Sequence, residues 1–186
     1  TALTLAPLRV GVPVVYTARF VPNKLIKLIR AHRPDIFMAI PSMYHALLNV
    51  KNADAEDMAS IRLAVSGAEP LPRTVREGFG ERFGVNILEG YGLTETGPIV
   101  SWSLPDHNEP GAVGPTLPGV EVRIVDGANQ PVPEGEHGEI TVRGPSVMAG
   151  YYKQPELTDA VFDAEGFFHT GDRGRIDERG LLWVTG

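Results

Sequence analysis

The 186-residue sequence contains no cysteine, which excludes disulfide bonds, thiolate metal sites and a cysteine nucleophile. It also lacks basic clusters, because its 17 lysines and arginines are scattered among 23 acidic residues and leave a net charge of -6. That charge argues against a nucleic-acid partner. No apolar run approaches the roughly 18 residues that a membrane helix needs. We therefore expect a cytoplasmic protein that has no membrane span and does not bind nucleic acid.

Hydrophobic residues make up 42% of the chain and charged residues 22%, so the sequence can bury a core. In the first half, short apolar or β-branched runs alternate with amphipathic stretches that begin at a proline. This alternation is typical of a parallel sheet with helices on its faces. The pattern predicts strands at 14–17, 36–40, 61–65 and 85–88, and helices that begin at Pro22, Pro41 and Pro72.

The pattern changes after about residue 104, where prolines interrupt the helical rhythm and short runs of alternating apolar and polar residues follow. The expected strands are 120–125, 139–143 and 181–184, with turn residues between the first two. We predict an α/β fold in which residues 1–107 form a mostly parallel sheet with flanking helices. Residues 108–186 are expected to form a small antiparallel, β-rich, barrel-like subdomain.

The sequence begins within one expected element and stops where another ends. Residues 1–5 begin inside an apolar segment, and residues 181–184 form an expected strand close to the last residue. We therefore expect the chain to be part of a longer protein, with further segments before and after it.

Two loops with unusual chemistry follow the third and fourth expected strands, at the edge where parallel sheets bind ligands. The first is Ser-Gly-Ala-Glu-Pro at 66–70, and the second is Glu-Gly-Tyr-Gly-Leu-Thr-Glu at 89–95. Tyr91 offers a ring for stacking, and Thr94 offers a donor for phosphate oxygens. Glu95 is a hard oxygen ligand suited to magnesium. The alternative is structural, since Gly-Tyr-Gly can simply turn the chain and Thr-Glu can cap a helix.

A third segment, His-Thr-Gly-Asp at 169–172, follows an apolar run. A carboxylate at Asp172 could accept hydrogen bonds from both hydroxyls of a ribose. Taken alone, such a segment is more often a turn.

These motifs together resemble the adenylate-forming superfamily, which contains acyl-CoA synthetases, luciferases and peptide-synthetase adenylation domains. The resemblance rests on EGYGLTE at 89–95, GEITVRGPSVMAGYY at 138–152 and GFFHTGD at 166–172, in this order. It implies that the whole protein activates a carboxylic acid with ATP, forms an acyl-adenylate, and transfers the acyl group to coenzyme A. The implied ligands are therefore ATP or AMP, Mg²⁺, coenzyme A and a carboxylic acid, which we expect to be a fatty acid.

The resemblance also assigns roles by position. Thr94 and Glu95 are the expected catalytic residues, and Glu95 is the expected magnesium ligand. Glu69 stands where many members carry alanine, which is tolerable if the backbone recognises the base. Residues expected to contact the nucleotide are Ala68, Glu69, Pro70, Glu89, Gly90, Tyr91, Gly92, Thr94 and Asp172. Residues expected to border the acyl group are Gly67, Gly90 and Leu93.

Three parts of the family's active site have no counterpart in the sequence. They are a Ser/Thr/Gly-rich loop with a lysine, an arginine expected just after Gly186, and the carboxyl-terminal domain with its catalytic lysine. We therefore expect the chain alone to be inactive. Two alternatives stay open, namely an enzyme that loads an acyl carrier protein and a non-catalytic nucleotide-binding module of the same fold. Ligases of aryl acids are close in sequence pattern to ligases of fatty acids, so the length and type of the acyl group stay open.

Overall fold

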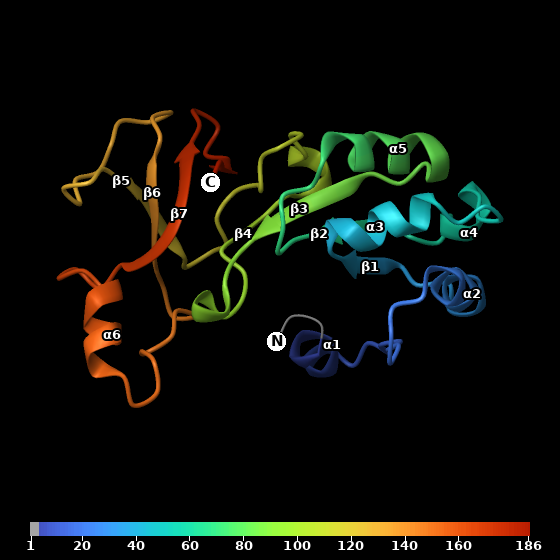
Figure 1. Cartoon of the computed structure of the whole chain (residues 1–186), viewed down its shortest axis with the longest axis horizontal. Helices are drawn as coiled ribbons and strands as arrows, with labels where there is room; N and C mark the ends of the chain where they lie inside the picture. The colour runs from blue at the N-terminus through green and yellow to red at the C-terminus, as the bar shows by residue number, and fades with distance from the viewer. Residues whose placement is uncertain (1–3) are drawn as a thin grey trace. The chain divides into compact units, whose positions relative to one another are not determined.

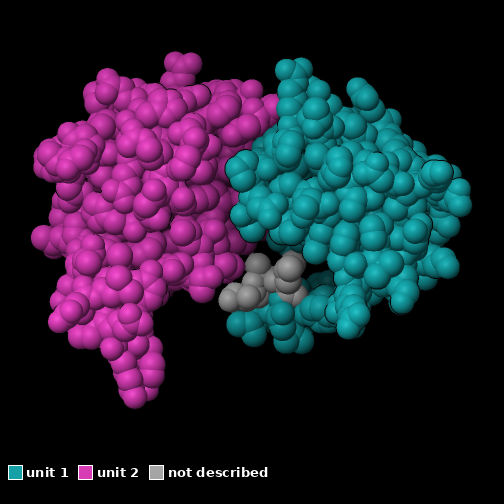
Figure 2. Space-filling view, in the orientation of Figure 1, with its two compact units in different colours: residues 1–89 teal, residues 90–186 magenta. Residues whose placement is uncertain are grey.

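The computed structural model describes residues 4–186, and the chain divides into two compact units, unit 1 (residues 1–89) and unit 2 (residues 90–186). Figure 2 colours them separately. The boundary between the two compact units therefore falls between Glu89 and Gly90. The subdomain boundary expected at 107/108 stays a prediction. Among the described residues, no helix is long and apolar enough to cross a membrane.

Unit 1 is an α/β layer built on parallel strands (Figure 1). β1 pairs with β2 and β2 with β3, both in parallel, which confirms the predicted sheet. The helices expected at Pro22 and Pro41 begin at those residues, where a proline leaves no backbone N–H unsatisfied. The elements are α1 (Leu5–Val10), α2 (Pro22–His32), β1 (Ile36–Ala39), α3 (Pro41–Leu48), α4 (Ala55–Met58), β2 (Leu63–Ser66), α5 (Arg73–Phe83) and β3 (Ile87–Tyr91).

The core of unit 1 lies between the sheet and the helices α2 to α5. Tyr44 on α3 is fully buried, and its ring meets Phe37 and Phe79 edge-on at centroid distances of 5.3 and 5.0 Å. Its hydroxyl donates to the Val65 carbonyl at 2.9 Å, so burial leaves this polar group satisfied. The helices are thereby fixed against the strands that lead to the predicted loops.

The strand expected at 14–17 is wrong. Residues 12–17 have no regular secondary structure, and Val14, Val15 and Tyr16 are 38%, 46% and 64% exposed. β-branched and aromatic residues favour strands because they pack well on a half-buried sheet surface. Within the described residues no strand pairs with this segment, so these side chains have no sheet surface on which to pack. The short helix α1, just before it, was not predicted.

Unit 2 contains an antiparallel sheet in the order β5-β6-β7-β8, which confirms the predicted antiparallel β-rich part. Its core is made of Val100, Val113, Ile124, Ile140, Val142 and Leu182. In Figure 1, α6 lies beside β7. The elements are η1 (Thr94–Thr96), β4 (Ser101–Trp102), η2 (Pro105–His107), β5 (Glu121–Val125), β6 (Gly138–Arg143), α6 (Pro155–Val161), β7 (Phe168–Ile176) and β8 (Leu182–Val184).

β7 is interrupted by a bulge opposite β6. Glu139 pairs with Arg173 and Thr141 with His169, so three residues of β7, 170–172, stand opposite the single residue Ile140 of β6. Gly171, at the centre of the bulge, has a φ of 77°, a left-handed conformation that glycine adopts without steric cost. Bulges re-aim side chains at functional sites. Here the bulge carries Asp172 out of the regular alternation of the strand.

Candidate functional site

The loop after β2 places Gly67 to Pro70 at the carboxyl end of the parallel sheet of unit 1. Ala68 has a φ of 70°, which costs a residue with a Cβ about 1–2 kcal/mol. Ala68, Glu69 and Pro70 are exposed. Strained backbone of this kind persists where the surrounding structure imposes it, and it often marks ligand sites. The backbone of this loop is therefore accessible, and its contact with a nucleotide stays a prediction.

Glu89 is buried and forms an ion pair with Arg76 of α5, with side-chain exposures of 10% and 13%. Its strand neighbour is Ser66, whose buried hydroxyl has no hydrogen-bond partner in the described structure. Burial lowers the pKa of Arg76, although a guanidinium remains charged at any working pH. Sequence reasoning missed Arg76, because nothing in the sequence of helix α5 indicates an ion-pair partner on a strand.

The prediction that residues 89–91 form a loop is wrong, since β3 continues through Tyr91. β4 explains the extension, because it pairs with the end of β3 through Gly90 and Tyr91 in the antiparallel direction. A Cβ added at Gly90 would lie 3.4 Å from the Ser101 carbonyl oxygen, an ordinary contact distance, so the pairing with β4 does not itself require glycine there. The loop proper therefore begins at Gly92.

Tyr91 and Asp172 lie 81 residues apart in sequence, and the Tyr91 hydroxyl donates to Asp172 Oδ2 at 2.7 Å. Burial raises the pKa of Tyr91, and the nearby Asp172 carboxylate adds to the shift, so the hydroxyl stays a donor. Both side chains are half-buried. Two of the predicted nucleotide residues are thus joined within unit 2.

The bulge that carries Asp172 is held by hydrogen bonds to β6. Glu139 accepts from the Gly171 N–H at 3.1 Å, and its other oxygen lies 3.0 Å from His169 Nδ1. The Thr170 hydroxyl donates to the Ile140 carbonyl at 2.7 Å and accepts from the Asp172 N–H at 3.0 Å. Sequence reasoning missed Glu139, whose alternating strand pattern gave no hint of this contact.

The turn after β3 is closely packed against its neighbours. A Cβ added at Gly92 would overlap the Pro98 carbonyl, so this position requires glycine for lack of space. In η1, the buried Thr96 hydroxyl donates to the Leu93 carbonyl at 3.0 Å and accepts from the Leu93 N–H at 2.9 Å. Thr96 therefore closes the turn, and Thr94 remains exposed.

Glu95 is half-buried, and its Oε1 accepts a hydrogen bond from the Tyr151 hydroxyl at 3.1 Å. Partial burial and this contact raise the pKa of Tyr151. Within residues 4–186, no group of three or more His, Asp or Glu residues could hold a metal by itself. A single carboxylate still fits Mg²⁺, which is commonly bound by one or two carboxylates together with substrate phosphates. Glu95 suits a magnesium ion that arrives with a nucleotide.

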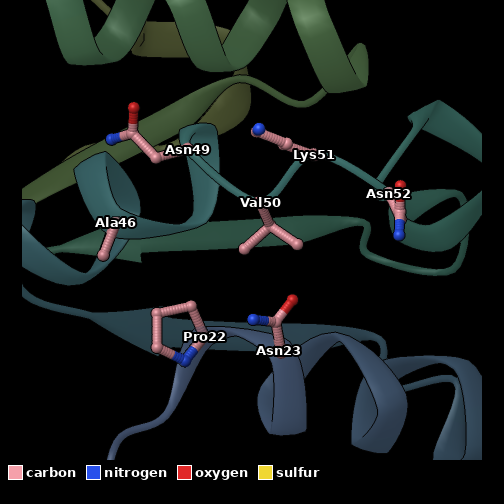
Figure 3. Close-up of a pocket in the computed structure, with 7 residues that line it drawn as sticks. All are labelled: Pro22, Asn23, Ala46, Asn49, Val50, Lys51 and Asn52. Atoms are coloured by element: carbon pink, nitrogen blue, oxygen red, sulfur yellow. The ribbon is translucent and has the colours of Figure 1, made fainter.

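A pocket of unit 1 lies elsewhere, between the start of α2 and the segment that follows α3 (Figure 3). It contains none of the predicted site residues. Lys51, its one charged lining residue, is exposed. The lining residues are Pro22, Asn23, Ala46, Asn49, Val50, Lys51 and Asn52.

The predicted nucleotide residues are divided between the units. Gly67 to Pro70 and Glu89 belong to unit 1, whereas Gly90 to Glu95 and Asp172 belong to unit 2. Within unit 2 the structure joins Tyr91 to Asp172. That all of these residues line one crevice stays a prediction.

Comparison with known proteins identifies the family. Residues 1–152 match the family model described as "AMP-binding enzyme". The chain is a member of the AMP-binding enzyme family. The resemblance stated from the sequence motifs, including the prediction of an adenylate-forming ligase family, is therefore confirmed.

The relatives of this AMP-binding chain are acyl-CoA ligases. It is 33% identical over 190 residues to a long-chain-fatty-acid–CoA ligase of Bacillus subtilis, covering 100% of this chain and 33% of that protein. It is 34% identical over 196 residues to 4-coumarate–CoA ligase 1 of Oryza sativa, covering 98% and 34%. The crystal structure of ATP-bound MatB from Rhodopseudomonas palustris superposes with a TM-score of 0.91 at 36% identity, covering 97% and 36%. The chain thus spans about a third of the length of these proteins.

Proposed function

We propose that the protein containing this chain is an ATP-dependent acyl-CoA ligase. It adenylates a carboxylic acid and transfers the acyl group to coenzyme A. The observation that carries the proposal is the Tyr91–Asp172 hydrogen bond at 2.7 Å, which brings together two nucleotide motifs that lie 81 residues apart. Membership of the AMP-binding family and the names of the relatives support the same activity. We also propose that the protein works in the cytoplasm.

In this proposal, each residue has a task set by its chemistry. The Tyr91 ring stacks on adenine, and Asp172 accepts hydrogen bonds from the ribose hydroxyls. The exposed Thr94 donates to the α-phosphate while the carboxylate oxygen of the acid attacks the α-phosphorus and pyrophosphate leaves. Glu95 binds Mg²⁺, which neutralises the charge on the phosphates when bound. The thiol of coenzyme A then attacks the acyl carbonyl and displaces AMP.

The proposed acid is a fatty acid. Support comes from residues 39–44, Ala-Ile-Pro-Ser-Met-Tyr, which resemble the matching segment of fatty-acyl-CoA ligases, and from the long-chain-fatty-acid–CoA ligase relative. The coumarate ligase relative makes an aromatic acid the competing substrate. Rates of acyl-CoA formation with a series of alkyl and aryl acids separate the two. A higher kcat/KM for aryl acids than for any fatty acid would contradict this part of the proposal.

The test of the site is Glu95→Gln in the intact enzyme. Glutamine keeps the size of the side chain and its acceptor toward Tyr151, but it removes the negative charge that attracts a hard cation. We expect adenylation to slow by on the order of 10²-fold and half-saturation to need more Mg²⁺. The melting temperature should stay unchanged. An unchanged magnesium titration together with a lowered melting temperature would instead give Glu95 a structural role.

The chain alone is proposed to be inactive, because it spans only about a third of its ligase relatives. Steady pyrophosphate release from ATP and a fatty acid by the purified 186-residue chain would refute this statement.

A further inference from the structure

Residues 144–152 of unit 2 pack directly against the turn that carries Glu95. The Met148 N–H donates to the Glu95 carbonyl at 2.7 Å. On the same turn, a Cβ added at Gly97 would lie 2.5 Å from the Ser146 carbonyl oxygen, so the two backbones are in contact there. The position of the Glu95 backbone is therefore set by a segment about fifty residues further along the chain.

Tyr151 extends this contact to the side chain of the same glutamate. Its hydroxyl donates to Glu95 Oε1 at 3.1 Å, and both side chains are half-buried. Among the residues that the structure describes, no other hydrogen bond reaches this carboxylate. One oxygen is thus held by the phenol, and Oε2 keeps its acceptor capacity for another ligand.

The backbone of Tyr151 is held in turn by α6. The Tyr151 N–H donates to the Thr158 hydroxyl at 2.9 Å, and that hydroxyl donates to the Gln154 carbonyl at 2.9 Å. Gly150 allows this approach, because an added Cβ would lie 2.6 Å from the Thr158 methyl group. Glu95 is therefore held by a phenol whose own backbone is anchored on a helix.

We propose that Tyr151 is a positioning residue that orients the Glu95 carboxylate, with Oε2 presented to the magnesium ion of the nucleotide. The inference rests on the proposed function, in which Glu95 is the magnesium ligand. Hydrogen-bonded partners of a metal-binding carboxylate fix its orientation, and their loss typically costs 10–100-fold in metal affinity or activity. Because Glu95 is half-exposed, water replaces part of the lost contact. We expect an effect of roughly 3- to 10-fold, at or below the low end of that range.

The sequence supplies a matched control next to Tyr151. Tyr152 is the same residue type, but it is 84% exposed, and its ring lies 5.2 Å from the Lys153 ammonium rather than near Glu95. Tyr151→Phe removes the hydroxyl and keeps the ring, so the packing of the segment is preserved. Tyr152→Phe makes the identical chemical change where no contact with Glu95 exists.

The experiment uses the intact enzyme and two measurements. Calorimetry gives the affinity for α,β-methylene-ATP, which is not cleaved, over a series of Mg²⁺ concentrations. Pyrophosphate release gives the rate over the same series. Tyr151→Phe should raise the Mg²⁺ concentration for half-saturation by roughly 3- to 10-fold in both assays, with the rate restored at saturating Mg²⁺. Tyr152→Phe should leave both curves unchanged.

The double variant Tyr151→Phe/Glu95→Gln separates this inference from the proposed function. If Tyr151 acts through Glu95, the double variant should match Glu95→Gln alone. If Glu95→Gln shifts the magnesium curve and Tyr151→Phe does not, the inference fails and the proposed function stands. If neither shifts it, the magnesium role of Glu95 fails, and the inference fails with it. Additive shifts, or a lowered melting temperature without a magnesium shift, would make Tyr151 a structural residue.

Discussion

Replacing Tyr91 by phenylalanine removes the hydroxyl that binds Asp172 and keeps the ring that is expected to stack on adenine. The hydrogen bond is 2.7 Å long and its acceptor is a carboxylate. Hydrogen bonds to charged groups contribute about 1.5–3 kcal/mol to stability. Asp172 is half-exposed, so water can partly replace the phenol, and the lower value applies. Since 1.4 kcal/mol corresponds to a factor of ten, we expect up to about tenfold weaker ATP binding.

The assay compares ATP with 3′-deoxy-ATP in the absence of an acid substrate, using calorimetry on the intact protein. If Asp172 binds the ribose hydroxyls and Tyr91 fixes Asp172, the variant should lose affinity for ATP more than for 3′-deoxy-ATP. The effect should not vary between about pH 6 and 9, because the raised pKa of Tyr91 keeps its hydroxyl protonated above the ordinary value near 10. Tyr152→Phe, at an exposed ring, is the control.

An equal loss for the two nucleotides would show that the hydroxyl does not act through the ribose contact. A change of less than about twofold in ATP affinity would show that Asp172 needs no partner to hold its orientation. Either result refutes the reasoning from the hydrogen bond.

Three further predictions concern stability and space. Arg76→Met should destabilise the protein by about 3 kcal/mol, because Glu89 would be left buried without its counter-charge, and adding Glu89→Leu should recover much of that loss in denaturant unfolding. Gly92→Ala should abolish nucleotide binding in calorimetry, because a Cβ there overlaps a backbone carbonyl, whereas Gly127→Ala, with open space around it, should bind normally. Arg30 donates a hydrogen bond to Asp57 and lowers the pKa of this carboxyl. The ionised Asp57 therefore stabilises the fold fully above its unfolded pKa of about 3.9, and this stabilisation is lost as the pH falls further. Asp57→Asn should therefore flatten the acid side of the melting-temperature profile.

The alternation of apolar runs and amphipathic helices was sufficient to predict the parallel sheet. The runs at 36–40 and 61–65 pair in parallel as β1 and β2, and the helices at Pro22 and Pro41 bury apolar residues at helical spacing. The same criterion failed at 14–17. A β-branched run predicts a strand only if another strand pairs with it, and pairing is a property of the tertiary structure.

Some residues of the candidate site were likewise predicted from the sequence, and others were missed. Tyr91, Glu95 and Asp172 were found from the sequence because each stands in a motif with unusual chemistry. Two supporting residues were not found, because Tyr151 contacts Glu95 and Glu139 contacts the bulge residue Gly171 from segments that are distant in the chain. Nothing in the local pattern around those residues reports such a contact.

The bulge in β7 has a consequence for how this fold tolerates change. Three residues, 170–172, stand opposite Ile140, so β7 carries two more residues than a regular ladder would need. An even number leaves the in-and-out alternation of the strand intact on both sides of the bulge, since side chains alternate with a period of two. Deleting both extra residues would therefore straighten the ladder without exchanging its faces, whereas deleting one would turn buried residues such as Phe168 toward solvent. Asp172 thus lies in a two-residue insertion that β7 could lose while the sheet keeps its two faces.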